Sequence, residues 1–297
     1  MRLKRVGARL DPRWLDAAPA EWRARWNPVA FDLGDGVTEM VAMGEGPPLL
    51  LLPPLPGWKE AWIAVAPLLA RRFRVLTFDL RAGVPGAQGW ARLVADVDRF
   101  VDAHVDGRLH VVGHSLGGAL AQRWALGRPE RVATLVLSST FARVGHAGGQ
   151  AWKRWLEQPV VIASQRWLPE RAAAPLARRL ARRSAWVYDP RCGEPVLAMV
   201  RHGLRTVPLR LARERVGLAF AHDLRDELPR LRVPVKIVVG ELDPAFWRRS
   251  ADELAHLLPH AERAVVPGAG HLHPLSHPEW LAARLESWLG AEHGARS

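Results

Sequence analysis

The strongest constraint on the fold is an alternation of short, largely apolar runs with helix-length stretches. Residues 30–43 read as a strand–turn–strand pair around Asp35-Gly36, at a sheet edge. Further predicted strands cover residues 49–52, 73–78, 109–112, 132–137, 235–239 and 264–266. Predicted helices cover residues 62–71, 90–105, 116–126, 246–258 and 279–289. This order predicts an α/β fold with a mostly parallel, doubly wound sheet, whose ligands bind at the carboxyl ends of the strands.

Size and composition narrow the class of protein. A chain of 297 residues holds one large α/β domain or two small ones. Its one cysteine, Cys192, excludes an intrachain disulfide. The basic N-terminus is not followed by an apolar segment, and the most apolar run, residues 47–58, is too short to cross a bilayer. We expect a cytoplasmic monomer or homodimer with no integral membrane segment.

The net charge of +12 is concentrated in two segments. Residues 1–29 carry seven basic and three acidic groups, and residues 141–228 carry sixteen basic and eight acidic groups. The rest of the chain is neutral. Because no aromatic–basic interleaving and no helix-turn-helix pattern accompanies the charge, we expect no nucleic-acid partner.

A predicted nucleophile lies between the strand at 109–112 and the helix at 116–126. The sequence there is Gly113-His114-Ser115-Leu116-Gly117-Gly118, a G-x-S-x-G pattern in the strand–turn–helix context that this motif requires. Glycines at the flanking positions allow the tight turn that exposes the serine. The alternative is a serine that only caps a helix after a glycine turn.

A serine nucleophile needs a base and an orienting carboxylate, which are expected later in the chain. Asp243 follows the strand at 235–239, and we prefer it to Glu241, which is interpreted as a solvated or loop-bonding residue. Asp243 could instead cap a helix or form an Asp-Pro turn. His271 follows the next strand and a glycine pair, and it is the predicted base. His273 lies close by, but no Cys or Asp accompanies the two histidines, so we expect no metal.

These segments together resemble the α/β-hydrolase superfamily. The matching pieces are residues 78–81, 113–118, 223–225 with 233–235, 240–244 and 268–271, and they stand in family order. The resemblance implies a Ser115–His271–Asp243 triad and an oxyanion hole formed by the backbone N–H groups of Leu116 and Leu55.

The loop that carries Leu55 departs from the family pattern. It reads Pro53-Pro54-Leu55-Pro56-Gly57, where the family usually has His-Gly before the donor residue. Proline has no N–H, so Leu55 is the donor that remains. A similar Leu-Pro-Pro departure occurs in the maspardin-like branch, which leaves open a non-catalytic binding protein on a hydrolase scaffold.

The resemblance also implies a division of the chain. Residues 1–29 form a basic arm, residues 30–140 and 229–297 form the core, and residues 141–228 form a helical cap. The cap contains four tryptophans and an arginine cluster, which are interpreted as packing residues and a solvated face. Alternatively, they wall an apolar acyl pocket and attract an anionic substrate. The segment holds Trp152, Trp155, Trp167, Trp186, Arg178, Arg179, Arg182 and Arg183.

The expected activity is hydrolysis of a carboxylic ester or thioester through an acyl-enzyme, with no cofactor. The substrate is expected to be a small acyl compound, anionic or apolar. C–C bond hydrolysis, lactonase and haloperoxidase activities use the same triad and remain alternatives. Epoxide chemistry with a cap tyrosine is disfavoured because the chain has only Tyr188.

Overall fold

The fold was analysed in a computed structural model that describes residues 26–81, 89–144 and 209–294. The basic arm up to residue 25 lies outside the described residues. So does most of the predicted cap, including its four tryptophans and its arginine cluster.

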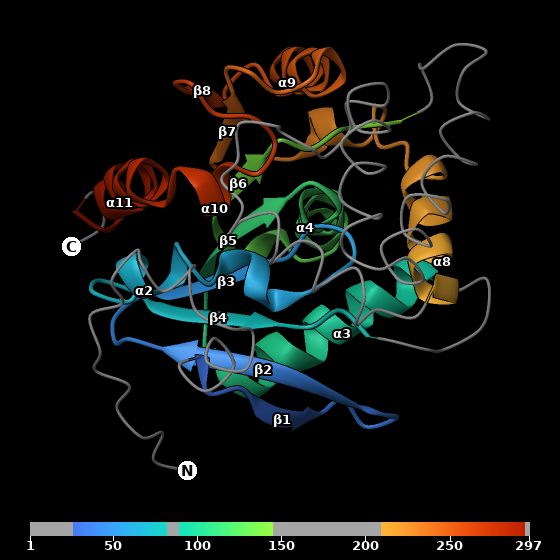
Figure 1. The fold of residues 1–297 in the computed structure, drawn as a ribbon, viewed down its shortest axis with the longest axis vertical. Helices are drawn as coiled ribbons and strands as arrows, with labels where there is room; N and C mark the ends of the chain where they lie inside the picture. The colour runs from blue at the N-terminus through green and yellow to red at the C-terminus, as the bar shows by residue number, and fades with distance from the viewer. Residues whose placement is uncertain (1–25, 82–88, 145–208, 295–297) are drawn as a thin grey trace, which may run out of the picture.

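An eight-stranded sheet forms the centre of the molecule, in the order β1-β2-β4-β3-β5-β6-β7-β8 (Figure 1). The strands are β1 (Val29–Asp32), β2 (Val37–Met43), β3 (Pro48–Leu52), β4 (Arg74–Phe78), β5 (Leu109–His114), β6 (Val132–Ser138), β7 (Val235–Gly240) and β8 (Glu262–Val266). β1 and β2 form the predicted antiparallel pair at one edge, and β2 also runs antiparallel to β4. The remaining neighbours are parallel. The α/β prediction is therefore confirmed.

Helices cover both faces of this sheet. The helical elements are η2 (Lys59–Trp62), α2 (Ala66–Leu69), α3 (Gly89–His104), α4 (Leu116–Gly127), η3 (Pro129–Arg131), α8 (Leu209–Phe220), η5 (Leu228–Arg230), α9 (Ala245–Leu257), α10 (His273–Ser276) and α11 (Pro278–Gly294). Figure 1 shows α2, α10 and α11 on one side of the sheet and α3, α4 and α8 on the other. None of the described helices is long and apolar enough to span a bilayer.

The helix predicted over residues 62–71 is replaced by two short elements, η2 and α2. Pro67 lies in the first turn of α2. A proline there lacks the N–H that would continue a helix from upstream, and its ring collides with the carbonyl four residues before it. The chain therefore makes a 3₁₀ turn and starts again. Helix α10 was not predicted, because four residues give too short a pattern.

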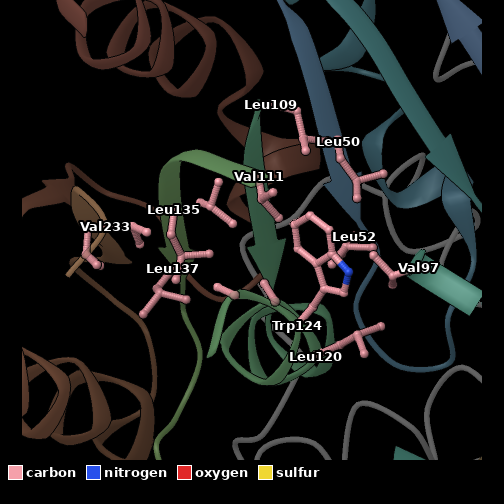
Figure 2. Close-up of a cluster of buried hydrophobic side chains, with 14 of the residues drawn as sticks. Leu50, Leu52, Val97, Leu109, Val111, Leu120, Trp124, Leu135, Leu137 and Val233 are labelled. Atoms are coloured by element: carbon pink, nitrogen blue, oxygen red, sulfur yellow. The ribbon is translucent and has the colours of Figure 1, made fainter. Parts of the chain in front are cut away.

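The continuous apolar runs are explained by burial on both faces of the sheet. Leu50 and Leu52 of β3 point into one hydrophobic cluster (Figure 2), whereas Leu49 and Leu51 point into the cluster on the opposite face. All four side chains are fully buried. Each buried leucine contributes about 1.5–3 kcal/mol to stability. Because two of the four leucines lie on each face, this strand packs against the helices on both sides of the sheet.

The two ends of the predicted cap lie side by side at the edge of the core. The backbone N–H of Leu224 donates to Ala142 O (3.1 Å), and Arg143 forms an isolated antiparallel bridge with Asp223. Within the described part of that segment, α8 packs against α3. The chain thus leaves the core after β6 and returns to the same place before β7.

Candidate active site

Ser115 lies on the turn between β5 and α4 in a strained backbone conformation. Its φ of 54° and ψ of −117° lie in a region that side chains other than glycine rarely adopt. Two hydrogen bonds hold the turn: Ser115 N–H donates to Ser138 O (2.9 Å), and Thr140 Oγ1 donates to Ser115 O (2.7 Å). The end of β6 and the residues just after it therefore fix a conformation that places Ser115 at the amino end of α4.

The glycines beside Ser115 permit contacts between backbones. A Cβ atom on Gly113 would come within 2.4 Å of Gly117 O, inside the same turn. A Cβ on Gly117 would come within 2.2 Å of Leu52 O and 2.6 Å of Pro53 O. The start of α4 thus touches the end of β3 and the loop that follows it, which is the loop that carries Leu55.

The structure brings Asp243 and His271 together. Asp243 follows β7, His271 follows β8, and Asp243 Oδ1 lies 3.1 Å from His271 Nδ1. Both side chains are buried. A proton on Nδ1 satisfies this carboxylate and leaves Nε2 as the basic nitrogen, which is the tautomer that a general base requires.

Several contacts keep the Asp243 carboxylate ionised. Burial alone would raise its pKa, but the His271 ring and a hydrogen bond from Ser139 outweigh burial, so the pKa lies below its ordinary value. Ser139 Oγ donates to Asp243 Oδ2 at 2.5 Å, and Gly240 N–H donates to the same oxygen at 3.2 Å. The carboxylate is thus held in one orientation and in its charged form.

Glu241 binds the loop that carries His271. Its Oε2 accepts a hydrogen bond from Gly268 N–H at 2.7 Å, in keeping with its interpretation as a loop-bonding residue. Leu242 N–H donates to Ala269 O at 2.8 Å. A Cβ on Gly240 would come within 2.4 Å of that same carbonyl. The loops after β7 and β8 are therefore packed as one unit.

Two further histidines lie close to His271 and remain neutral. The His114 ring centroid is 4.9 Å from that of His271 and 5.0 Å from that of His273. Burial lowers the pKa of His114 well below its ordinary value and that of His273 to about 4. Ser138 Oγ contacts both His114 Nδ1 (3.0 Å) and His273 Nε2 (2.8 Å). His271, next to the Asp243 carboxylate, is the ring placed to take up a proton.

The ring contact between His114 and His271 places His271 near Ser115, because His114 is the residue directly before the serine. All three predicted triad residues therefore follow the carboxyl ends of parallel strands: Ser115 follows β5, Asp243 follows β7 and His271 follows β8. In the sheet, β7 and β8 are neighbours and β6 separates β7 from β5. Within residues 26–81, 89–144 and 209–294, no group of three or more His, Cys, Asp or Glu side chains could hold a metal ion.

The predicted oxyanion donors lie on the two backbones that meet at Gly117. Leu116 begins α4, so its N–H has no partner within the helix. Leu55 occupies a turn closed by the hydrogen bond from Gly57 N–H to Pro54 O (2.5 Å). The helix macrodipole also favours negative charge at the start of α4.

A buried ion cluster anchors the loop that carries Leu55. Lys59 Nζ is fully buried and lies 2.7 Å from Glu60 Oε1, 3.0 Å from Asp79 Oδ2 and 3.1 Å from Glu39 Oε2. Lys59 N–H also donates to Asp79 Oδ1 at 2.8 Å. Because Asp79 directly follows β4, the cluster ties this loop to the sheet.

Sequence reasoning missed Ser139 and Trp247. The signal for Ser139 was a run of three hydroxyl residues, Ser138-Ser139-Thr140, at the carboxyl end of β6. Trp247 stacks on His271, and only its position four residues after Asp243 could have suggested it.

Comparison of the sequence and the structure with known proteins points to one family. Residues 47–278 match a family model described as the alpha/beta hydrolase fold. A pimeloyl-[acyl-carrier protein] methyl ester esterase from Nitrosomonas europaea is 33% identical over 256 residues, which cover 82% of this chain and 96% of the esterase. A hydrolase from Pseudomonas aeruginosa has a similar structure (TM-score 0.74, 26% identity, 89% of this chain and 98% of that one). A thermophilic esterase from Thermogutta terrifontis is also similar in structure (TM-score 0.72, 25% identity, 90% of this chain and 99% of that one).

Proposed function

Because the chain belongs to the alpha/beta hydrolase fold family, we propose that it is a serine hydrolase. Its substrate is a carboxylic ester or thioester, which it cleaves through an acyl-enzyme formed on Ser115. The observation that carries the proposal is the buried Asp243–His271 pair, 3.1 Å apart, beside the strained turn of Ser115.

In the first half-reaction, Ser115 Oγ attacks the carbonyl carbon while His271 Nε2 takes the hydroxyl proton. Asp243 holds the Nδ1–H tautomer and stabilises the imidazolium that forms. His271 then gives the proton to the leaving alcohol or thiol, and the ester bond breaks.

The negative charge that develops on the carbonyl oxygen is bound by the N–H groups of Leu116 and Leu55. One such donor contributes a factor of about 10²–10³ in kcat. The contact of Gly117 with Leu52 O and Pro53 O supports this assignment, because it sets the spacing between the two backbones.

In the second half-reaction, His271 removes a proton from water while the water oxygen bonds to the acyl carbon. The bond between the acyl carbon and Ser115 Oγ then breaks, His271 returns the proton to Ser115 Oγ, and the acid leaves. Neutral His114 and His273 place no positive charge against His271 at either step. The chain's own side chains supply every proton transfer, so the proposal needs no cofactor.

We assign residues 141–228 to a cap over the site, supported by the adjacent ends of this segment at Ala142 and Leu224. Its excess of basic residues suggests an effect on access. If they attract substrate, hydrolysis of anionic esters will slow with added salt, while hydrolysis of neutral esters will not. If salt changes the hydrolysis of anionic and neutral esters equally, these basic residues contribute to solubility and not to substrate access.

The proposal is tested with a panel of acyl esters graded in chain length and charge. Methyl esters are included because the similar Nitrosomonas protein is named as a methyl ester esterase. We expect turnover of at least one ester by the wild-type chain and a loss of about 10³-fold or more in S115A. Equal turnover by S115A would refute the assignment.

A further inference from the structure

Trp247 lies flat against the proposed catalytic base. Its ring centroid is 4.0 Å from that of His271, and the two planes are inclined by only 22°. Both side chains are buried, with 2% and 3% of their surface exposed. Contact of this kind fixes the plane of the imidazole as well as its position.

The turn that presents Asp243 also places this indole. Trp247 lies in the first turn of α9, where its backbone N–H donates to Pro244 O at 2.9 Å. One short segment therefore supplies the carboxylate on the edge of the imidazole and the aromatic ring on its face.

Other rings hold Trp247 in place. The ring centroids of Phe246 and Phe141 lie 4.9 Å and 6.0 Å from that of Trp247. Phe141 lies three residues after the end of β6, and Ala119 of α4 belongs to the same buried cluster. The indole cannot turn away from His271 without opening this packing.

The charged and titratable groups around His271 come from three elements. Asp243 lies at Nδ1, His114 comes from β5, and His273 comes from α10. The two histidines are neutral at ordinary pH, so Asp243 is the ionised group in this set. The negative face of an indole adds a second stabilising surface for an imidazolium.

We propose that Trp247 is a positioning residue for His271, which holds the ring with Nδ1 toward Asp243 and Nε2 toward Ser115. This inference rests on the proposed serine hydrolase function. During acylation the Ser115 O–H bond breaks, an N–H bond forms at His271 Nε2, and the new positive charge lies against the indole face. Trp247 thus acts only through His271.

The test compares W247L, W247F and F100L with the wild-type chain. Phe100 is fully buried and stacks on Phe78, with 4.3 Å between the ring centroids, in a hydrophobic cluster that does not contain Trp247. F100L is therefore a matched control for the loss of an aromatic stack. One readout is the NMR signal of the hydrogen-bonded His271 Nδ1 proton, assigned with H271Q. The other is kcat and KM on the best ester of the panel.

We expect W247L to broaden or remove the Nδ1 proton signal, because the ring is no longer held in one plane against Asp243. In the same variant kcat falls about 10- to 100-fold as the ring loses its orientation, whereas KM stays close to that of the wild type. W247F, which keeps an aromatic face, retains the signal and restores most of kcat. F100L leaves the signal and kcat in place, whatever it does to stability.

A wild-type Nδ1 proton signal and a wild-type kcat in W247L would overturn the proposal, as would an equal loss of both in F100L. Should W247L not fold, W247M, which fills more of the space but has no aromatic face, is judged by the same criterion. The two readouts separate this proposal from the proposed function. Loss of the proton signal in W247L of a chain that hydrolyses no ester refutes the function alone, whereas ester hydrolysis with an unchanged signal and kcat in W247L refutes the role of Trp247 alone.

Discussion

Replacing Gly117 with alanine tests whether the spacing between α4 and the loop after β3 sets the rate. The new Cβ would lie 2.2 Å from Leu52 O, 2.6 Å from Pro53 O and 2.6 Å from Leu52 C. All three are backbone atoms, so no side chain can swing aside. The Cβ···O distance has to open from 2.2 Å to at least 3.0 Å. We expect this movement to increase the distance between the Leu116 and Leu55 amides by about 1 Å.

A displacement of about 1 Å in a catalytic constellation costs about 10²-fold in rate, and the loss of one oxyanion donor costs about 10²–10³-fold. We therefore expect kcat/KM of G117A to fall by at least about 10²-fold, most of it in kcat. The assay is steady-state hydrolysis of the best ester in the panel, with the melting temperature recorded in parallel.

The matched control is G127A at the other end of the same helix. A Cβ on Gly127 would meet nothing within 4 Å. Since alanine favours the helix over glycine, G127A should gain about 0.5–1 kcal/mol in stability and keep its activity. A G117A protein that hydrolyses esters at the wild-type rate would refute the reasoning.

Two further substitutions test the groups around the site. S139A removes the hydroxyl that donates to Asp243 Oδ2 at 2.5 Å, so urea unfolding should show a loss of about 1–3 kcal/mol, against less than about 0.5 kcal/mol for the control S276A. E60Q removes a carboxyl group whose pKa is raised to about 7 by burial and by the nearby Asp79 carboxylate. As pH rises from about 4.5 to about 7, the unfolded chain releases this proton before the folded chain does, so stability falls. The unfolding free energy of the wild type relative to E60Q should therefore drop by about 2–3 kcal/mol over this range, and a difference that does not change with pH would contradict the account.

The sequence allowed the sheet and the three proposed catalytic residues to be located because each signal is local. Ser115, Asp243 and His271 each follow an apolar strand, and the carboxyl ends of parallel strands meet at one edge. The family order of the segments added Leu55 and Leu116. None of these inferences required knowledge of how distant side chains pack.

The contacts that sequence reasoning missed depend on packing between elements. Trp247 stacks on a residue from another loop, and Ser139 reaches the carboxylate that follows a neighbouring strand. Lys59 is a basic residue that is fully buried, which no periodicity predicts, because it is paired with its neighbour Glu60 and with the distant carboxylates of Glu39 and Asp79. The split of the helix predicted over residues 62–71 was foreseeable from Pro67, whereas the two short elements that replace it were not.

The most direct test of the central claim is covalent labelling with a fluorophosphonate, followed by intact mass and peptide mapping. We expect one adduct per chain, on Ser115, with no adduct in S115A and a rate of labelling that falls sharply in H271Q. A correctly folded wild-type chain that takes up no label, or takes it up on another residue, would contradict the proposed mechanism. It would favour instead a binding protein built on a hydrolase scaffold.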